Sequence, residues 1–131
     1  MSAASASPAV LCVGRLYCDL IFTDVPRMPT LGTETFAGGF EIHAGGGAYI
    51  TSAWLASLGH ATALACFLPP PPFRDKIGEE IALAGVDVSL SKAAPNGEAP
   101  QLTVSIATDG DRALLTHQPG PPFPMLSAGD I

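Results

Sequence analysis

Basic residues are scarce in this sequence, and they are not clustered. Lysine and arginine together number 6 against 12 acidic residues, so the formal net charge is −6 at pH 7. A protein that tracks nucleic acid needs a basic surface to neutralise the phosphates. The composition therefore excludes nucleic acid as a partner.

Cysteine is also rare, and no apolar run is long. The three cysteines (Cys12, Cys18 and Cys66) are an odd number without metal-ligand spacing, which indicates reduced thiols in a cytoplasmic protein and no bound metal. The apolar run at residues 61–68 is far shorter than the roughly 20 residues that a membrane-spanning helix needs. The N-terminal residues lack the charged and apolar regions of a signal peptide. We therefore expect no membrane association.

Apolar residues are abundant: 47% of the sequence is hydrophobic and only 14% is charged, which indicates one globular domain after a disordered tail at residues 1–8. Continuous apolar runs at residues 9–13 and 61–68 predict buried strands. Helical patterns at about residues 46–58 and 73–84 alternate with them, which is typical of an α/β fold. Alternating strands at about residues 16–25, 33–42 and 102–116 predict a second, smaller β sheet, with a hairpin turn at Asp109-Gly110.

The most informative feature is a glycine run at the start of the first predicted helix. Glycine allows a ligand to approach the backbone closely, and a helix start offers unpaired N–H groups, so Gly45, Gly46 and Gly47 are candidate ligand contacts. A tight turn without a ligand is the alternative. The apolar residues behind the glycines share one helical face: Ile50, Ala53, Trp54 and Leu58. We expect Trp54 in the core, and Ile50 is a further candidate for the ligand pocket.

Asp19 follows the first buried strand, where α/β proteins commonly bind ligands. A carboxylate there accepts hydrogen bonds from a diol, although a surface carboxylate is the alternative. Thr103 and Ser105 alternate along a later strand and are candidates for lining the same pocket; solvated strand positions explain them equally well.

Other motifs follow in a fixed order along the chain. Val13-Gly14 precedes Asp19, residues 29–35 read PTLGTET, and Gly45-Gly46 precede a helix that ends at Leu58-Gly59. Residues 84–87 then read AGVD, ahead of the Asp109-Gly110 turn. In this order and spacing, residues 9–120 resemble the N-terminal half of a ribokinase-like carbohydrate kinase of the PfkB family.

The resemblance implies a central parallel-type sheet with flanking helices and a small β lid, formed by the strands near 16–25, 33–42 and 102–116. It implies transfer of the γ-phosphoryl group of ATP to a sugar hydroxymethyl group, with Asp19, Gly45 and Gly46 in contact with the sugar. ATP and Mg²⁺ would belong to a longer parent protein, because the family's catalytic base and nucleotide site lie in a C-terminal half. The apolar face of such a lid is also a candidate surface for a homodimer.

The sequence departs from the family pattern in three places. Ile50 stands where we expect the family's asparagine, which leaves a less polar pocket that suits a nucleoside as well as a sugar. Four prolines at residues 69–72 replace a polar turn. Residues 127–130 (SAGD) resemble the family's catalytic motif, but they come too early in the order of elements. We interpret residues 121–131 as a proline-rich loop that leads to a missing half, and we expect no catalytic residue here. The alternative functions are a nucleoside kinase and a non-catalytic module for ligand binding or dimerisation through the lid.

Overall fold

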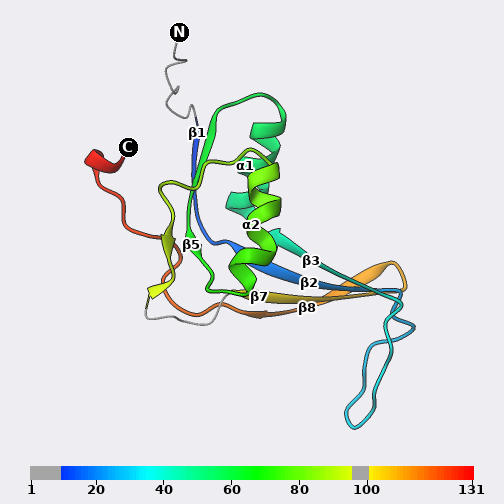
Figure 1. The fold of residues 1–131 in the computed structure, drawn as a ribbon. Coiled ribbons are helices and arrows are strands. Elements are labelled where there is room, and N and C mark those ends of the chain that lie inside the picture. The colour runs from blue at the N-terminus through cyan, green and yellow to red at the C-terminus, as the bar shows by residue number, and fades with distance from the viewer. Residues whose placement is uncertain (1–9, 96–100) are drawn as a thin grey trace.

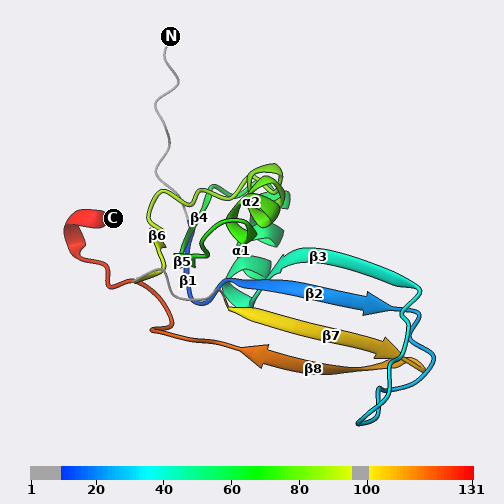
Figure 2. The ribbon, with the colours of Figure 1, turned by 60° about the horizontal axis from the view of Figure 1, so that its bottom comes forward.

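The structure is a computed structural model that describes residues 10–95 and 101–131. It has an α/β body, from which a four-stranded sheet projects to one side (Figures 1 and 2). The tail expected at residues 1–8 lies outside the described residues. This arrangement is the mixed α/β fold that the sequence predicted.

The body contains two parallel strands covered by helices. Strand β1 (Val10–Val13) pairs with β4 (Thr62–Ala65), and α1 (Gly47–Ser57) packs against both strands. Every residue of β4 is buried, as its uninterrupted apolar run predicted. The run does not continue as one strand to residue 68, however. It breaks at Cys66, and the short β5 (Phe67–Leu68) pairs instead with β6 (Lys92–Ala93).

Helix α2 (Phe73–Leu83) forms where the sequence predicted it. Ile77 and Ile81 are one helical turn apart and are 1% and 3% exposed, so this face enters the core. Gly85 follows the helix with a φ of +76°, a conformation that favours glycine.

The projecting sheet has the strand order β3-β2-β7-β8. Strand β2 (Tyr17–Thr23) pairs antiparallel with β3 (Gly39–Gly45) and parallel with β7 (Leu102–Thr108), and β7 continues through a hairpin into β8 (Asp111–His117). Asp109 and Gly110 both have positive φ angles, as a two-residue hairpin turn requires.

The strand expected at residues 33–42 was placed too early. Residues 33–37 have no regular structure, and the strand runs from Gly39 to Gly45. The reason is its partner: β2 ends at Thr23, so residues before Gly39 have no strand to pair with, whereas Ala44 and Gly45 pair with Cys18 and Tyr17. Residues 24–38 form a long connection beyond the far end of the sheet (Figure 1).

The buried face of α1 also differs from the prediction. Trp54 is 67% exposed, and Ile50 is 50% exposed, whereas Tyr49 and Ser52 are buried. Ala48 and Ala56 also pack against the core, and a β-carbon on Gly14 would lie 2.8 Å from Ala48 Cβ, so the helix passes close to the end of β1. The Ser52 hydroxyl is satisfied by donating to the Tyr49 carbonyl at 2.7 Å. Three residues of the apolar stripe (Ile50, Trp54 and Leu58) therefore face outward, whereas Ala53 packs against the core.

Candidate functional site

Asp19 and Gly45 lie against each other at the inner end of the projecting sheet. The register of β2 and β3 places Asp19 opposite His43 and Tyr17 opposite Gly45, so all four residues share one sheet face. A β-carbon built on Gly45 would lie 2.7 Å from Cγ of Asp19. Gly45 is therefore the residue that leaves room for the carboxylate.

The other two glycines begin α1. Gly46 is its N-cap, with a φ of +98°, and a β-carbon there would lie 2.5 Å from the Arg15 carbonyl oxygen. Gly47 is the first helical residue, and a β-carbon there would have no atom within 4 Å. No side chain caps this end of the helix. The site thus combines unpaired N–H donors at a helix start with a neighbouring carboxylate acceptor.

Burial raises the pKa of Asp19, and the Glu80 carboxylate raises it further, while His43 and Arg112 act in the opposite direction. Among the hydrogen bonds found in residues 10–95 and 101–131, none involves the Asp19 side chain. A partly buried carboxylate without a protein partner is costly to the folded protein and is common at functional sites. Asp19 is therefore free to accept hydrogen bonds from a ligand.

The two hydroxyl candidates on β7 share the face of Asp19. The parallel register pairs Asp19 with Thr103 and Ile21 with Ser105. Ser105 is buried, at 7% exposed, and Thr103 Oγ1 lies 3.0 Å from Thr116 Oγ1 on β8. Ile50 is not on this sheet: it lies on α1, one turn after Gly46, and half of its surface is exposed.

Sequence reasoning missed three neighbours of the site. Tyr17 lies beside the glycines: its Cδ2 atom would be 3.0 Å from a β-carbon on Gly46, and its hydroxyl donates to Gln118 Oε1 at 2.5 Å. The two-residue period of β2 could have placed Tyr17 on the face of Asp19. His43 lies opposite Asp19, and Glu80 approaches from α2. No local pattern indicates the contact with Glu80.

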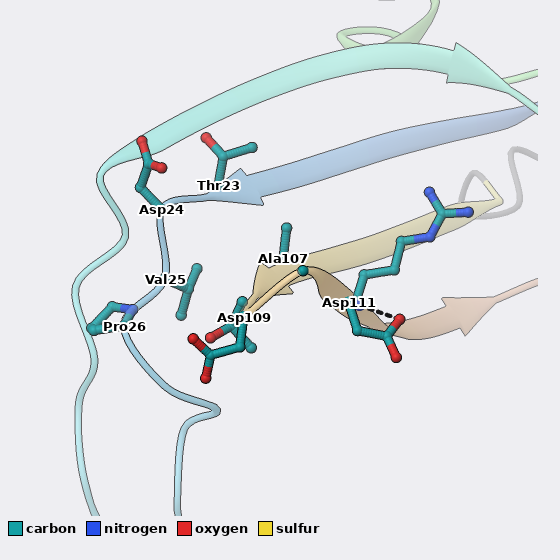
Figure 3. A pocket seen from close by; sticks show the side chains of 10 residues that line it. Thr23, Asp24, Val25, Pro26, Ala107, Asp109 and Asp111 are labelled. Carbon is teal, nitrogen blue, oxygen red and sulfur yellow. Dashed lines mark hydrogen bonds between the residues drawn. The ribbon is translucent and has the colours of Figure 1, made fainter.

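A separate hollow of about 730 Å³ lies at the opposite end of the sheet. Residues 23–26 and 107–112 line it, and several carboxylates surround it (Figure 3). The Asp111 carboxylate accepts a hydrogen bond from the Arg112 amide at 2.8 Å, so it is part of the turn. The hollow is at the far end of β2 from Asp19 and is not part of the candidate site.

The SAGD segment forms a short 3₁₀ turn, Ala128–Asp130, rather than a catalytic helix start. The Asp130 carboxylate accepts hydrogen bonds from the amide and hydroxyl of Ser127, at 2.7 and 2.8 Å. These bonds lower the pKa of Asp130. The Asp130 carboxylate thus caps the start of this short turn.

Comparison with known proteins identifies the fold. No family model matches the sequence, and the search of curated proteins gave no match. Among solved structures, the ribokinase of Cryptococcus neoformans with ADP matches at 22% identity and a TM-score of 0.68. The ribokinase of Arabidopsis thaliana with ribose and ATP matches at 22% identity and a TM-score of 0.73. A PfkB protein from Polaromonas matches at 18% identity and a TM-score of 0.73.

The chain has a ribokinase-like fold. These three comparisons cover 85%, 86% and 95% of this chain. The chain spans only 35%, 36% and 40% of the length of the three structures. The resemblance found in the sequence is therefore confirmed at the level of the fold. The chain, however, corresponds to nearer a third of the length of those proteins than to the half that we expected.

Two further findings concern metals and membranes. Within the described part of the chain, no group of three or more His, Cys, Asp or Glu side chains is arranged to hold a metal ion. Both α1 and α2 have 11 residues, and the described residues include no helix with the length and apolar character needed to cross a membrane.

Proposed function

We propose that this chain is the substrate-binding part of an ATP-dependent sugar kinase, which transfers the γ-phosphoryl group of ATP to a sugar hydroxymethyl group. One observation carries the proposal: the Asp19 carboxylate lies over Gly45, beside the uncapped start of α1. A sugar hydroxyl both donates and accepts hydrogen bonds. Acceptors and donors placed side by side therefore suit neighbouring hydroxyls of one sugar.

In this proposal Asp19 accepts hydrogen bonds from two hydroxyls, and the backbone at Gly45, Gly46 and Gly47 contacts the sugar. The open space beside Gly47 leaves room for the ligand. Thr103 and Ser105 lie on the same face as Asp19, and we propose that they line the sugar pocket. A ligand without the hydroxyls would leave the carboxylate unpaired, which is how such a site rejects analogues.

ATP and Mg²⁺ enter the proposal only through a longer protein that contains this chain. The Cryptococcus and Arabidopsis structures, which contain ADP and ATP, extend well beyond the part that this chain matches. We assign the nucleotide, the metal and the catalytic base to residues outside 1–131. The outward apolar stripe of α1 (Ile50, Trp54 and Leu58) supports this division, because further structure could cover it.

The projecting sheet is the proposed lid, and it has one apolar face. The register places Phe22 opposite Phe40 and Leu20 opposite Ile42, and Val104 lies opposite Leu115. Phe40 is 53% exposed and Leu115 is 75% exposed, while the rings of Phe22 and Phe40 are 5.0 Å apart. We propose that two copies of the chain pair through this apolar sheet face.

A thermal-shift panel tests the binding function. Ligand at a hundred times its Kd stabilises a protein by about 2.7 kcal/mol, so binding raises the melting temperature measurably. We expect a shift with D-ribose or a related sugar in the wild-type chain and none in Asp19→Asn. A shift with nucleosides alone would favour the alternative, a nucleoside kinase. Shifts that persist in Asp19→Asn would refute the assigned site.

Enzyme activity separates the kinase from a non-catalytic binding module. A longer protein encoded by the same reading frame should release ADP from ATP in the presence of the bound sugar. Binding without ADP release would favour the module.

We assign the chain to the cytoplasm because its three cysteines are free, and Cys18 and Cys66 are buried.

A further inference from the structure

A side chain of the α/β body bridges to the projecting sheet at the edge of the candidate site. Glu80 lies on α2, and its Oε2 atom accepts a hydrogen bond from the Ala44 amide at 2.7 Å. Its Oε1 atom lies 3.2 Å from His43 Nδ1. Both partners belong to β3, so one carboxylate holds two consecutive residues of this strand.

The position of β3 explains why a side chain is needed there. Strand β3 is at one edge of the sheet, so the Ala44 amide has no neighbouring strand on the α2 side. Ala44 is 7% exposed, and an amide buried without an acceptor is costly. A carboxylate is a strong acceptor for such an amide, because charge-assisted hydrogen bonds are stronger than neutral ones.

The charged side chains around His43 lie on three different elements. Its Nε2 atom lies 3.3 Å from Glu41 Oε2 on the same strand, Glu80 approaches from α2, and Asp19 lies opposite on β2. Both ion pairs found among the described residues include His43. Of these two pairs, only His43–Glu80 joins the body to the sheet, and it lies beside Asp19.

We infer that Glu80 is a positioning residue, which holds β3 against α2 so that Gly45 and Asp19 keep their places beside the start of α1. Ala44, which donates to Glu80, precedes Gly45 in the chain, and His43, the other partner of Glu80, is paired with Asp19 on the neighbouring strand. Loss of the Glu80 carboxylate releases β3, the strand that leads into the glycine turn (Gly45, Gly46 and Gly47). This role in ligand binding rests on the proposed function, whereas the attachment of β3 to α2 does not.

The neighbouring Glu79 provides a matched control. It lies on the same helix and carries the same charge, but it is exposed and lines a different hollow, between α2 and residues 86–88. Glu79→Ala changes helix composition and net charge just as Glu80→Ala does. Only Glu80→Ala removes the acceptor of the Ala44 amide.

The first test is hydrogen exchange of the Ala44 amide, measured by NMR on the whole chain without ligand. We expect exchange to be at least about tenfold faster in Glu80→Ala than in wild type, since hydrogen bonds to charged groups contribute about 1.5–3 kcal/mol. Glu80→Gln keeps an acceptor oxygen and should restore part of the protection; this variant also serves if Glu80→Ala does not fold. Glu79→Ala should match wild type. Equal exchange in wild type and both Glu80 variants would overturn the attachment.

The second test is the Kd for D-ribose in the same variants. We expect Kd to rise about tenfold in Glu80→Ala, less in Glu80→Gln, and not at all in Glu79→Ala. Faster Ala44 exchange with an unchanged Kd would overturn the positioning role. Failure of the wild-type chain to bind D-ribose or any other sugar of the panel would instead count against the proposed function, and the exchange test would still decide the attachment.

Discussion

Replacing Gly45 with alanine tests the contact on which the candidate site depends. The added β-carbon would lie 2.7 Å from Asp19 Cγ and 3.0 Å from Oδ1. The backbone at Gly45 does not have a positive φ, so alanine meets no backbone penalty there. The whole cost therefore comes from the Asp19 carboxylate, which must rotate away from its place over the strand.

We expect Gly45→Ala to lower the free energy of unfolding by about 1 kcal/mol, the size of an off-rotamer side chain or mild overpacking. For a chain of this length, that corresponds to a fall in melting temperature of roughly 4 °C. Binding of the sugar should suffer far more, because the carboxylate leaves the site. Chemical denaturation followed by circular dichroism measures the first effect, and an NMR titration with D-ribose measures the second.

The Asp19→Ala background isolates the clash. Without the carboxylate, Gly45→Ala should be neutral or stabilising by up to about 0.5–1 kcal/mol, since glycine is unfavourable in a strand. The double-mutant cycle should therefore show a coupling of about 1 kcal/mol or more between the two positions. Gly47→Ala is the control, because its β-carbon meets no atom within 4 Å. An equal cost of Gly45→Ala with and without Asp19 would refute the reasoning.

Three further predictions follow from the same structure. Gly46→Ala should lower the free energy of unfolding by about 2–3 kcal/mol, because the residue has a φ of +98° and its added β-carbon would lie 2.5 Å from the Arg15 carbonyl oxygen. Chemical denaturation measures this change, and a smaller loss of stability than in Gly45→Ala would contradict the prediction. Burial lowers the pKa of His43, but its hydrogen bonds with two glutamates outweigh burial and raise the pKa above 6.5. The protonated His43 should therefore stabilise the folded protein below pH 6.5, and this stabilisation should be lost as the pH rises through the raised pKa of His43; its size is less than about 1 kcal/mol, because His43 and its glutamate partners are exposed. The urea midpoint measured against pH should show this dependence in wild type and lose it in His43→Asn. An unchanged dependence in the variant would exclude His43 as its source. Leu115→Lys should shift a dimer to monomer in light scattering, whereas Leu114→Lys, on the opposite sheet face, should not; equal effects would argue against pairing through the apolar face.

The sequence predicted those elements whose local pattern and packing agree. Helix α2 is one: Ile77 and Ile81 follow helical spacing, and both are buried. The β7–β8 hairpin is another, because Asp109-Gly110 specifies its turn locally. Asp19 and the glycines could be selected as candidates from their order along the chain, and the structure places Asp19 against Gly45.

The wrong predictions and the missed contact concern features that local pattern does not determine. Trp54 belongs to the apolar stripe of α1, yet the helix buries Tyr49 and Ser52 instead, so the tryptophan faces outward. The start of β3 depends on where β2 ends, at Thr23. The contact between Glu80 and Ala44 joins residues 36 positions apart, and no sequence period connects them.

The most direct test of the account is an NMR titration of the chain with D-ribose, in wild type and in Asp19→Asn. The account predicts saturable shifts of the amide signals of Gly45, Gly46 and Gly47 in wild type, and at least about a tenfold weaker response in Asp19→Asn, the loss expected when a charge-assisted hydrogen bond is removed. Equal affinity in the two proteins, or shifts confined to residues away from the glycine turn, would contradict it.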